Sequence, residues 1–137
     1  MKIREIIYEF EKLGVKTNPG ASKEQIEQLE KHIDYKFPIT FIEFYSDLNG
    51  FKDGVWNKNM FSLFSLERIK EEYGDSKNEI FIPFCDYLHN SHQIGFCKEG
   101  DGIYIDYNVF LRDYNDKVSD SFEQSLIEIL KNSEKIY

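Results

Sequence analysis

The chain has 137 residues, 41% of them hydrophobic and 16% aromatic, and its 25 acidic residues against 17 Lys and Arg give a formal net charge of −8. A chain of this length is expected to form one domain, residues 1–137, with an aromatic-rich core that needs no metal or disulfide to stabilise it. The charge argues against direct nucleic-acid binding because phosphate backbones repel an acidic protein, and no apolar run approaches the roughly 20 residues that span a bilayer.

Residues 3–13 repeat apolar side chains at helical spacing, and Gly14 is placed to end that helix. The segment is amphipathic and carries acids, so it does not resemble a signal peptide, and we expect a cytoplasmic protein. With no secretion signal, Cys85 and Cys97 are expected to be free thiols.

A second helix follows a predicted turn at residues 18–20, and Ser22 with Gln25 forms a capping box at its start. The residues expected to face the core are Ile26, Leu29 and Ile33. The residues expected to face water are Glu24, Glu27, Glu30 and Lys31.

A third helix is predicted to begin at Pro38 and to end at Asn49-Gly50, two residues that tolerate left-handed backbone angles. Its expected buried residues are Phe41, Ile42, Tyr45 and Leu48. The stretch "NGFKDGVW", residues 49–56, then joins the helices to the strands, and Trp56 is expected to cover the edge of the core.

Alternating apolar residues dominate the second half of the chain. The predicted strands span residues 60–64, 80–84, 94–97, 103–107 and 109–114. Pro83 lacks a backbone donor, so its strand is expected to lie at a sheet edge or to end there. Ser65 is expected to cap a short helix, and Asp120 with Glu123 to cap the last one. The order predicts an α+β fold, with N-terminal helices and a C-terminal helix packed on a mainly antiparallel sheet.

Four residues of "CDYLHNSHQIGFC" have side chains of the types that bind zinc: Cys85, His89, His92 and Cys97. Their spacing matches no standard zinc motif, so we interpret them as packing cysteines and surface histidines and predict no metal or cofactor. A zinc site, or an enzyme with a Cys-His pair, remains the alternative. Close carboxylate pairs are expected by chance among 25 acids, and together these observations favour a protein that is not an enzyme.

Acidic residues crowd the second half of the chain, with tyrosines beside them. Tyrosine is enriched at protein interfaces, so the region is a candidate partner-binding surface. The candidate residues are Asp86, Tyr87, Glu99, Asp101, Asp106, Tyr107, Asp113 and Asp116. The alternative is a solvated face that serves only solubility.

The segment "GASKEQIEQLEKHIDYKFPITFIEFYSDLNGF" resembles the opening of the SMI1/KNR4 family, also called the SUKH superfamily. The later half is also similar, with "IPF" at 82–84, a Gly-Asp-Gly hairpin leading into "IYIDYN" at 103–108, and a closing helix that starts "SFEQSL". The resemblance covers about residues 20–131 and implies a SUKH-like fold.

Many bacterial members of this superfamily look like immunity proteins, which bind and block a toxin encoded beside them. The resemblance therefore implies an immunity protein (antitoxin) that neutralises a cognate toxin, possibly a nuclease, through protein–protein contact. An acidic inhibitor suits a toxin with a basic surface, and neither nucleic acid nor membrane is expected as a direct partner. The superfamily also contains cell-wall regulators, so the alternative is a non-catalytic regulatory or scaffold protein with a non-toxin partner.

Overall fold

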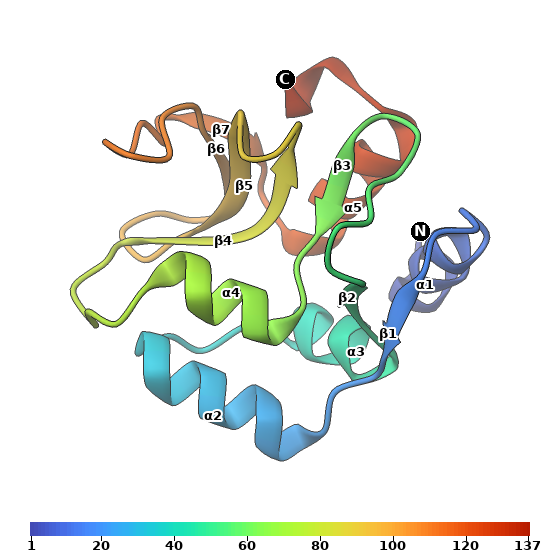
Figure 1. The fold of residues 1–137 in the computed structure, drawn as a ribbon, viewed down its shortest axis with the longest axis horizontal. Coiled ribbons are helices and arrows are strands. Elements are labelled where there is room, and N and C mark those ends of the chain that lie inside the picture. The colour runs from blue at the N-terminus through green and yellow to red at the C-terminus, as the bar shows by residue number, and fades with distance from the viewer.

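Helices and strands follow one another largely in the order that the apolar spacing predicts. The computed structural model describes residues 1–137, with five α-helices, a two-stranded sheet and a five-stranded sheet (Figure 1). The helices are α1 (Ile3–Glu11), α2 (Lys23–Ile33), α3 (Ile39–Asp47), α4 (Leu66–Tyr73) and α5 (Phe122–Lys131), followed by the 3-10 helix Glu134–Ile136. The strands are β1 (Thr17–Pro19), β2 (Leu48–Phe51), β3 (Phe61–Leu63), β4 (Phe81–Tyr87), β5 (His92–Cys97), β6 (Ile103–Asp106) and β7 (Asp116–Ser119). The α+β fold class is confirmed, and no helix has the length and apolar character needed to cross a bilayer.

Serine side chains begin three of the helices. Ser22 accepts a hydrogen bond from the backbone of Gln25, which reaches back to the backbone of Ser22, so the predicted capping box is confirmed. Ser65 caps α4 as predicted. The cap of α5, however, is Ser121, and the prediction of Asp120 was wrong by one residue because the serine hydroxyl reaches the free backbone amide.

The larger sheet is antiparallel throughout, in the order β3-β4-β5-β6-β7. The predicted edge position of Pro83 is wrong, because β4 pairs with strands on both sides. The register shifts between Pro83 and Cys85, so the residue without a donor lies beside a bulge. Opposite it, Gly95 has no room for a side chain, since an added Cβ would lie 2.2 Å from the carbonyl oxygen of Ile82.

The Asn49-Gly50 pair lies in a strand and does not end α3 as predicted. β2 pairs with β1, and the side chain of Asn18 donates to the carbonyl oxygens of Asn49 and Phe51. This pairing places residues 48–51 in a strand, and residues 17–19 form its partner strand where a turn at 18–20 was predicted. Gly50 has a φ of +70°, and Asn49 accepts from the backbone of Leu66 at the start of α4. Residues 48–51 therefore connect α3 to β1 by strand pairing and to α4 by the side chain of Asn49.

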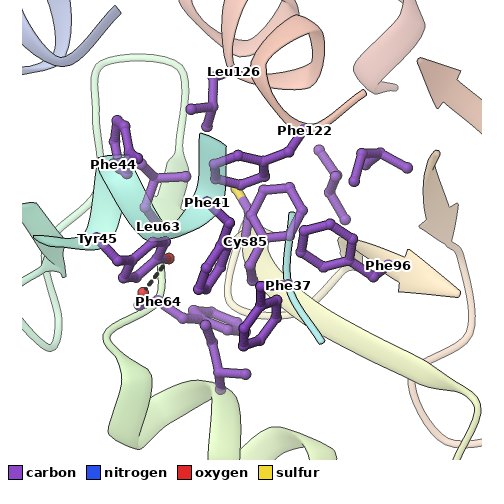
Figure 2. Close-up of a cluster of buried hydrophobic side chains, with 14 of the residues drawn as sticks. Phe37, Phe41, Phe44, Tyr45, Leu63, Phe64, Cys85, Phe96, Phe122 and Leu126 are labelled. Atoms are coloured by element: carbon purple, nitrogen blue, oxygen red, sulfur yellow. Dashed lines mark hydrogen bonds between the residues drawn. The ribbon is translucent and has the colours of Figure 1, made fainter. Parts of the chain in front are cut away.

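The centre of the core is a cluster of aromatic rings around Phe122 of α5 (Figure 2). Its ring centroid lies 5.2 Å from that of Phe41, 5.1 Å from that of Phe84 and 5.7 Å from that of Phe96. Helices α3 and α5 thus meet the sheet through aromatic side chains. Tyr45 is also buried here, and its hydroxyl donates to the carbonyl oxygen of Phe64 at 2.7 Å.

Glu30 was predicted to face water, and this was wrong. Its carboxylate is buried, accepts from the backbone of Phe37 at 2.8 Å and lies 3.8 Å from the ammonium group of Lys36. The chain leaves α2 through a left-handed residue, Asp34, and folds back over the helix end. Glu30 supplies the acceptor that this returning backbone requires.

Candidate partner-binding surface

Two of the acids predicted to bind a partner are buried inside the sheet. Asp86 of β4 pairs in register with Gln93 of β5, and Gln93 pairs with Asp106 of β6, so their three side chains share one face of the sheet. All three are completely buried. The expectation that Asp86 and Asp106 lie on an exposed rim is wrong, because each carboxylate binds groups that cover this face.

Asp106 organises the loop between β6 and β7. Its carboxylate accepts from the backbone nitrogens of Asn108 at 3.1 Å and Asp113 at 2.6 Å, and from the guanidinium of Arg112 at 2.7 Å. The side chain of Asn108 in turn accepts from the backbone of residues 110 and 111. One buried carboxylate therefore holds both ends of the loop, and its charge is matched by one arginine.

Arg112 connects this loop to the rest of the covered face. Its guanidinium donates to the side chain of Gln93 at 2.9 Å and lies 5.3 Å from the ring centroid of Phe81. The amide of Gln93 donates to Glu72 of α4 at 3.1 Å. Hydrogen bonds therefore run from α4 across the sheet to the β6–β7 loop and fix the position of the loop.

Asp86 has a different environment. One oxygen accepts from the indole nitrogen of Trp56 at 3.0 Å, and the other has no hydrogen-bond partner, although Arg68 lies 3.6 Å away. Burial raises the pKa of Asp86 above its ordinary value of 3.8, and the Trp56 hydrogen bond and the Arg68 charge only partly offset this. Trp56 also packs on the ring of His89 at a centroid distance of 4.2 Å, so it covers the edge of the sheet.

Four other predicted acids are exposed. Glu99 and Asp101 lie in the turn between β5 and β6, whereas Asp113 and Asp116 lie in the loop after β6 and at the start of β7. None of them takes part in the eight ion pairs of the structure. We call these four residues the acidic rim.

The three tyrosines near these acids differ in exposure. Tyr87 packs against His92 inside an aromatic cluster, and Tyr114 stacks on Phe81 at a centroid distance of 5.6 Å. Tyr107 is the most open, with 39% of its surface exposed. Partial burial and the nearby carboxylate of Asp116 raise the pKa of Tyr107 above its ordinary value.

Residues 109–114, which were predicted to form a strand, lie in the β6–β7 loop. Residues 109–114 form no strand, and Phe110 is 96% exposed while Leu111 is 81% exposed. Asn108 was the available signal, because its side chain can cap the turn that follows. The three apolar residues that follow it, 109–111, favoured the prediction of a strand instead.

The four possible zinc ligands have separate environments. Cys85 is buried among the core rings, and burial raises the pKa of its thiol well above the ordinary range (Figure 2). Cys97 and His92 are both buried in β5, so the interpretation of His92 as a surface histidine is wrong. Its Nε2 lies 2.9 Å from the carbonyl oxygen of Ile136. No group of three or more His, Cys, Asp or Glu side chains is close enough together to hold a metal ion.

An open hollow lies beside the N-terminal part of α2. It has a volume of about 620 Å³ and no hydrophobic lining residue. Its walls include Asn18, Gln25, Asn49, Lys52 and Glu67. Specific ligand sites are usually concave and mainly apolar, so this hollow lacks the character of one.

Comparison with known proteins supports the resemblance noted from the sequence. No curated protein matches the chain. The model of the SMI1 / KNR4 family (SUKH-1) matches residues 20–128, nearly the range over which the motifs resemble that family. Because the match covers most of the chain and the fold is α+β as expected, the protein belongs to the SMI1/KNR4 family (SUKH-1).

Proposed function

We propose that this protein is a non-catalytic immunity protein that binds a cognate bacterial toxin with a basic surface and blocks it in the cytoplasm. Membership of the SMI1/KNR4 family supports an immunity-type role. The net charge of −8 supports a basic partner. The mechanism is occlusion of the toxin's active site or substrate groove by the surface of the folded chain.

The observation that carries this proposal is the acidic rim. Its four carboxylates are exposed and have no cation within ion-pair distance in the chain, although Lys117 close by pairs with Asp120 at 2.6 Å. Unpaired surface charge of one sign attracts a basic partner over a range of about 8–10 Å at physiological salt. It therefore speeds association more than it strengthens the final complex.

The direct test begins by reading the genes on either side of this one, and it uses as the candidate partner any toxin-like protein that they encode. Association and dissociation rates are measured for the wild type and for a variant with Glu99→Gln, Asp101→Asn, Asp113→Asn and Asp116→Asn. We expect the association rate of the variant to fall by about tenfold or more at low salt, and the wild-type rate to fall as salt is added.

A matched control removes four exposed acids from the helical side of the molecule, which Figure 1 places away from the β6–β7 loop. The control changes are Glu11→Gln, Glu24→Gln, Glu27→Gln and Glu43→Gln, all at exposed positions. The control should change the association rate much less than the rim variant. Equal effects of the two variants on the association rate would show that only net charge matters. A wild-type association rate that does not change with salt concentration would favour the scaffold alternative.

A further inference from the structure

The tip of the β6–β7 loop presents the two most exposed large hydrophobic side chains of the molecule, Phe110 and Leu111. They are adjacent in the chain, in the loop between β6 and β7, which lies on the side away from α1 (orange in Figure 1). A single exposed Leu is ordinary, but an exposed Phe-Leu pair on a protruding loop offers substantial apolar surface to a partner.

The loop holds this projection in place before any partner binds. Asp106 accepts from three groups of the loop, and Asn108 accepts from the backbone of both tip residues. Arg112, at the far end of the tip, is tied to Gln93 of β5. A loop ordered in advance loses less conformational entropy on binding, which favours affinity.

The surrounding charge selects among possible occupants. Asp113 and Asp116 lie two and five residues after Leu111, and both are exposed without ion pairs. A second copy of this chain would bring the same acids face to face, and anionic lipids or nucleic acids would also be repelled. A protein surface with an apolar hollow surrounded by Lys and Arg would complement both the apolar tip and the acidic residues beside it.

We propose that Phe110 and Leu111 are the apolar anchor of the complex and insert into a hollow of a basic partner protein, while Asp113 and Asp116 pair with cations at its border. This inference rests on the proposed function, since it names the contact through which the toxin is held. Buried aromatic anchors surrounded by polar contacts are the usual source of binding energy at such interfaces.

The first experiment measures affinity for the neighbouring toxin with Phe110→Ala and Leu111→Ala combined. The expected loss is about 30-fold or more, mainly as faster dissociation, because anchor contacts form in the final complex. The control combines Tyr8→Ala with Ile39→Ala, two other exposed residues on the helical side, and should change affinity less than about threefold. Urea unfolding of both variants confirms that the fold is retained.

A second experiment separates this inference from the identity of the partner. A photo-crosslinking amino acid replaces Phe110, or Ile39 as the control, in the full chain in its own cells. Adducts at position 110 and not at position 39 support the anchor when the captured protein is identified, is basic, and binds the purified wild type more tightly than the double Ala variant. This holds even where the neighbouring toxin does not bind. Wild-type toxin binding that survives the double Ala variant overturns the anchor and leaves the proposed function intact. The absence of a specific adduct at position 110, or an adduct with an acidic protein or with a second copy, also overturns the anchor.

Discussion

The aromatic centre around α5 and the β6–β7 loop use the same residue types for opposite purposes. Phe122 is 2% exposed and contacts rings from α3 and the sheet, whereas Phe110 is 96% exposed and contacts solvent. Asp106 is completely buried and fixes the loop, whereas Asp116, the first residue of β7, is exposed and unpaired. The comparison shows that residue type does not decide which side chains this fold buries and which it leaves in water. The position of a residue relative to the sheet decides it.

The contrast is physical, because the rings around Phe122 and the carboxylate of Asp106 have partners inside the protein, whereas Phe110 and Asp116 face water. The rings of the core remove apolar area from water, and the carboxylate of Asp106 exchanges water for three donors. The loop tip and the acidic rim remain in contact with water, which a partner could replace. Removing a buried member should therefore cost stability, and removing an exposed member should cost binding.

The largest effect is expected for Phe122→Ala. The change leaves a cavity among Phe41, Phe84 and Phe96, and we expect a loss of about 3–5 kcal/mol in the free energy of unfolding. Urea titration followed by circular dichroism measures it. The matched change Phe110→Ala should alter that free energy by less than about 0.5 kcal/mol. Equal costs at the two positions would contradict the distinction between core and loop.

Asp106→Ala should have the next largest effect, about 3 kcal/mol, because it leaves the partly buried Arg112 without its counter-charge and two backbone amides without an acceptor. Hydrogen exchange of residues 107–115 should also increase, since the loop loses its support. The control, Asp116→Ala, should change the free energy of unfolding by less than about 0.5 kcal/mol.

Asp86→Asn tests whether a buried acid can be dispensable. Folding raises the pKa of Asp86, so the folded state binds more protons than the unfolded state just above the ordinary value of 3.8. The wild type should therefore lose some stability as pH rises through this range, and the Asn variant should not. At pH 7 we expect the variant to be about as stable as the wild type, or about 1 kcal/mol more stable.

Trp56 supplies an independent measurement, since it is the only tryptophan and donates to Asp86. Its fluorescence should change as Asp86 titrates, at a pH above the ordinary range of a surface aspartate. In the Asn variant this transition should be absent. A transition that persists unchanged would assign the titration to another group.

The smallest effect on stability is expected for charge reversal on the acidic rim. Asp113→Lys with Asp116→Lys should change the free energy of unfolding by less than about 0.5 kcal/mol, because neither residue forms an ion pair. The same variant should associate with a basic partner at least about tenfold more slowly. A large loss of stability would show that these acids also have a structural role.

Helix positions were predictable from sequence because local rules govern them. The capping serines at 22 and 65 and the apolar faces of α2 and α5 depend on residues three or four apart. The family resemblance was also readable, because its motifs are short stretches in a characteristic order. The hairpin of β5 and β6 follows from two alternating strands separated by glycines.

The errors occurred where distant segments meet. Asn49-Gly50 was predicted to end a helix, but it pairs with β1. Pro83 was predicted to lie at a sheet edge, but its strand pairs with β3 and β5 on its two sides. Residues 109–114 looked like a strand because their apolar content resembles one. Their actual form depends on the buried carboxylate of Asp106, which cannot be seen from the run itself.

The sequence by itself determined the family, the α+β class, the helix caps and the acidic character of the second half, because these depend on composition and on neighbours along the chain. Only the tertiary structure decided which acids are available to a partner. Asp86 and Asp106 were withdrawn from the surface by pairing across three strands, and Phe110 was placed outside it by the loop that Asp106 holds. Exposure is set by what covers a residue, and the covering groups come from α4 and from the β6–β7 loop.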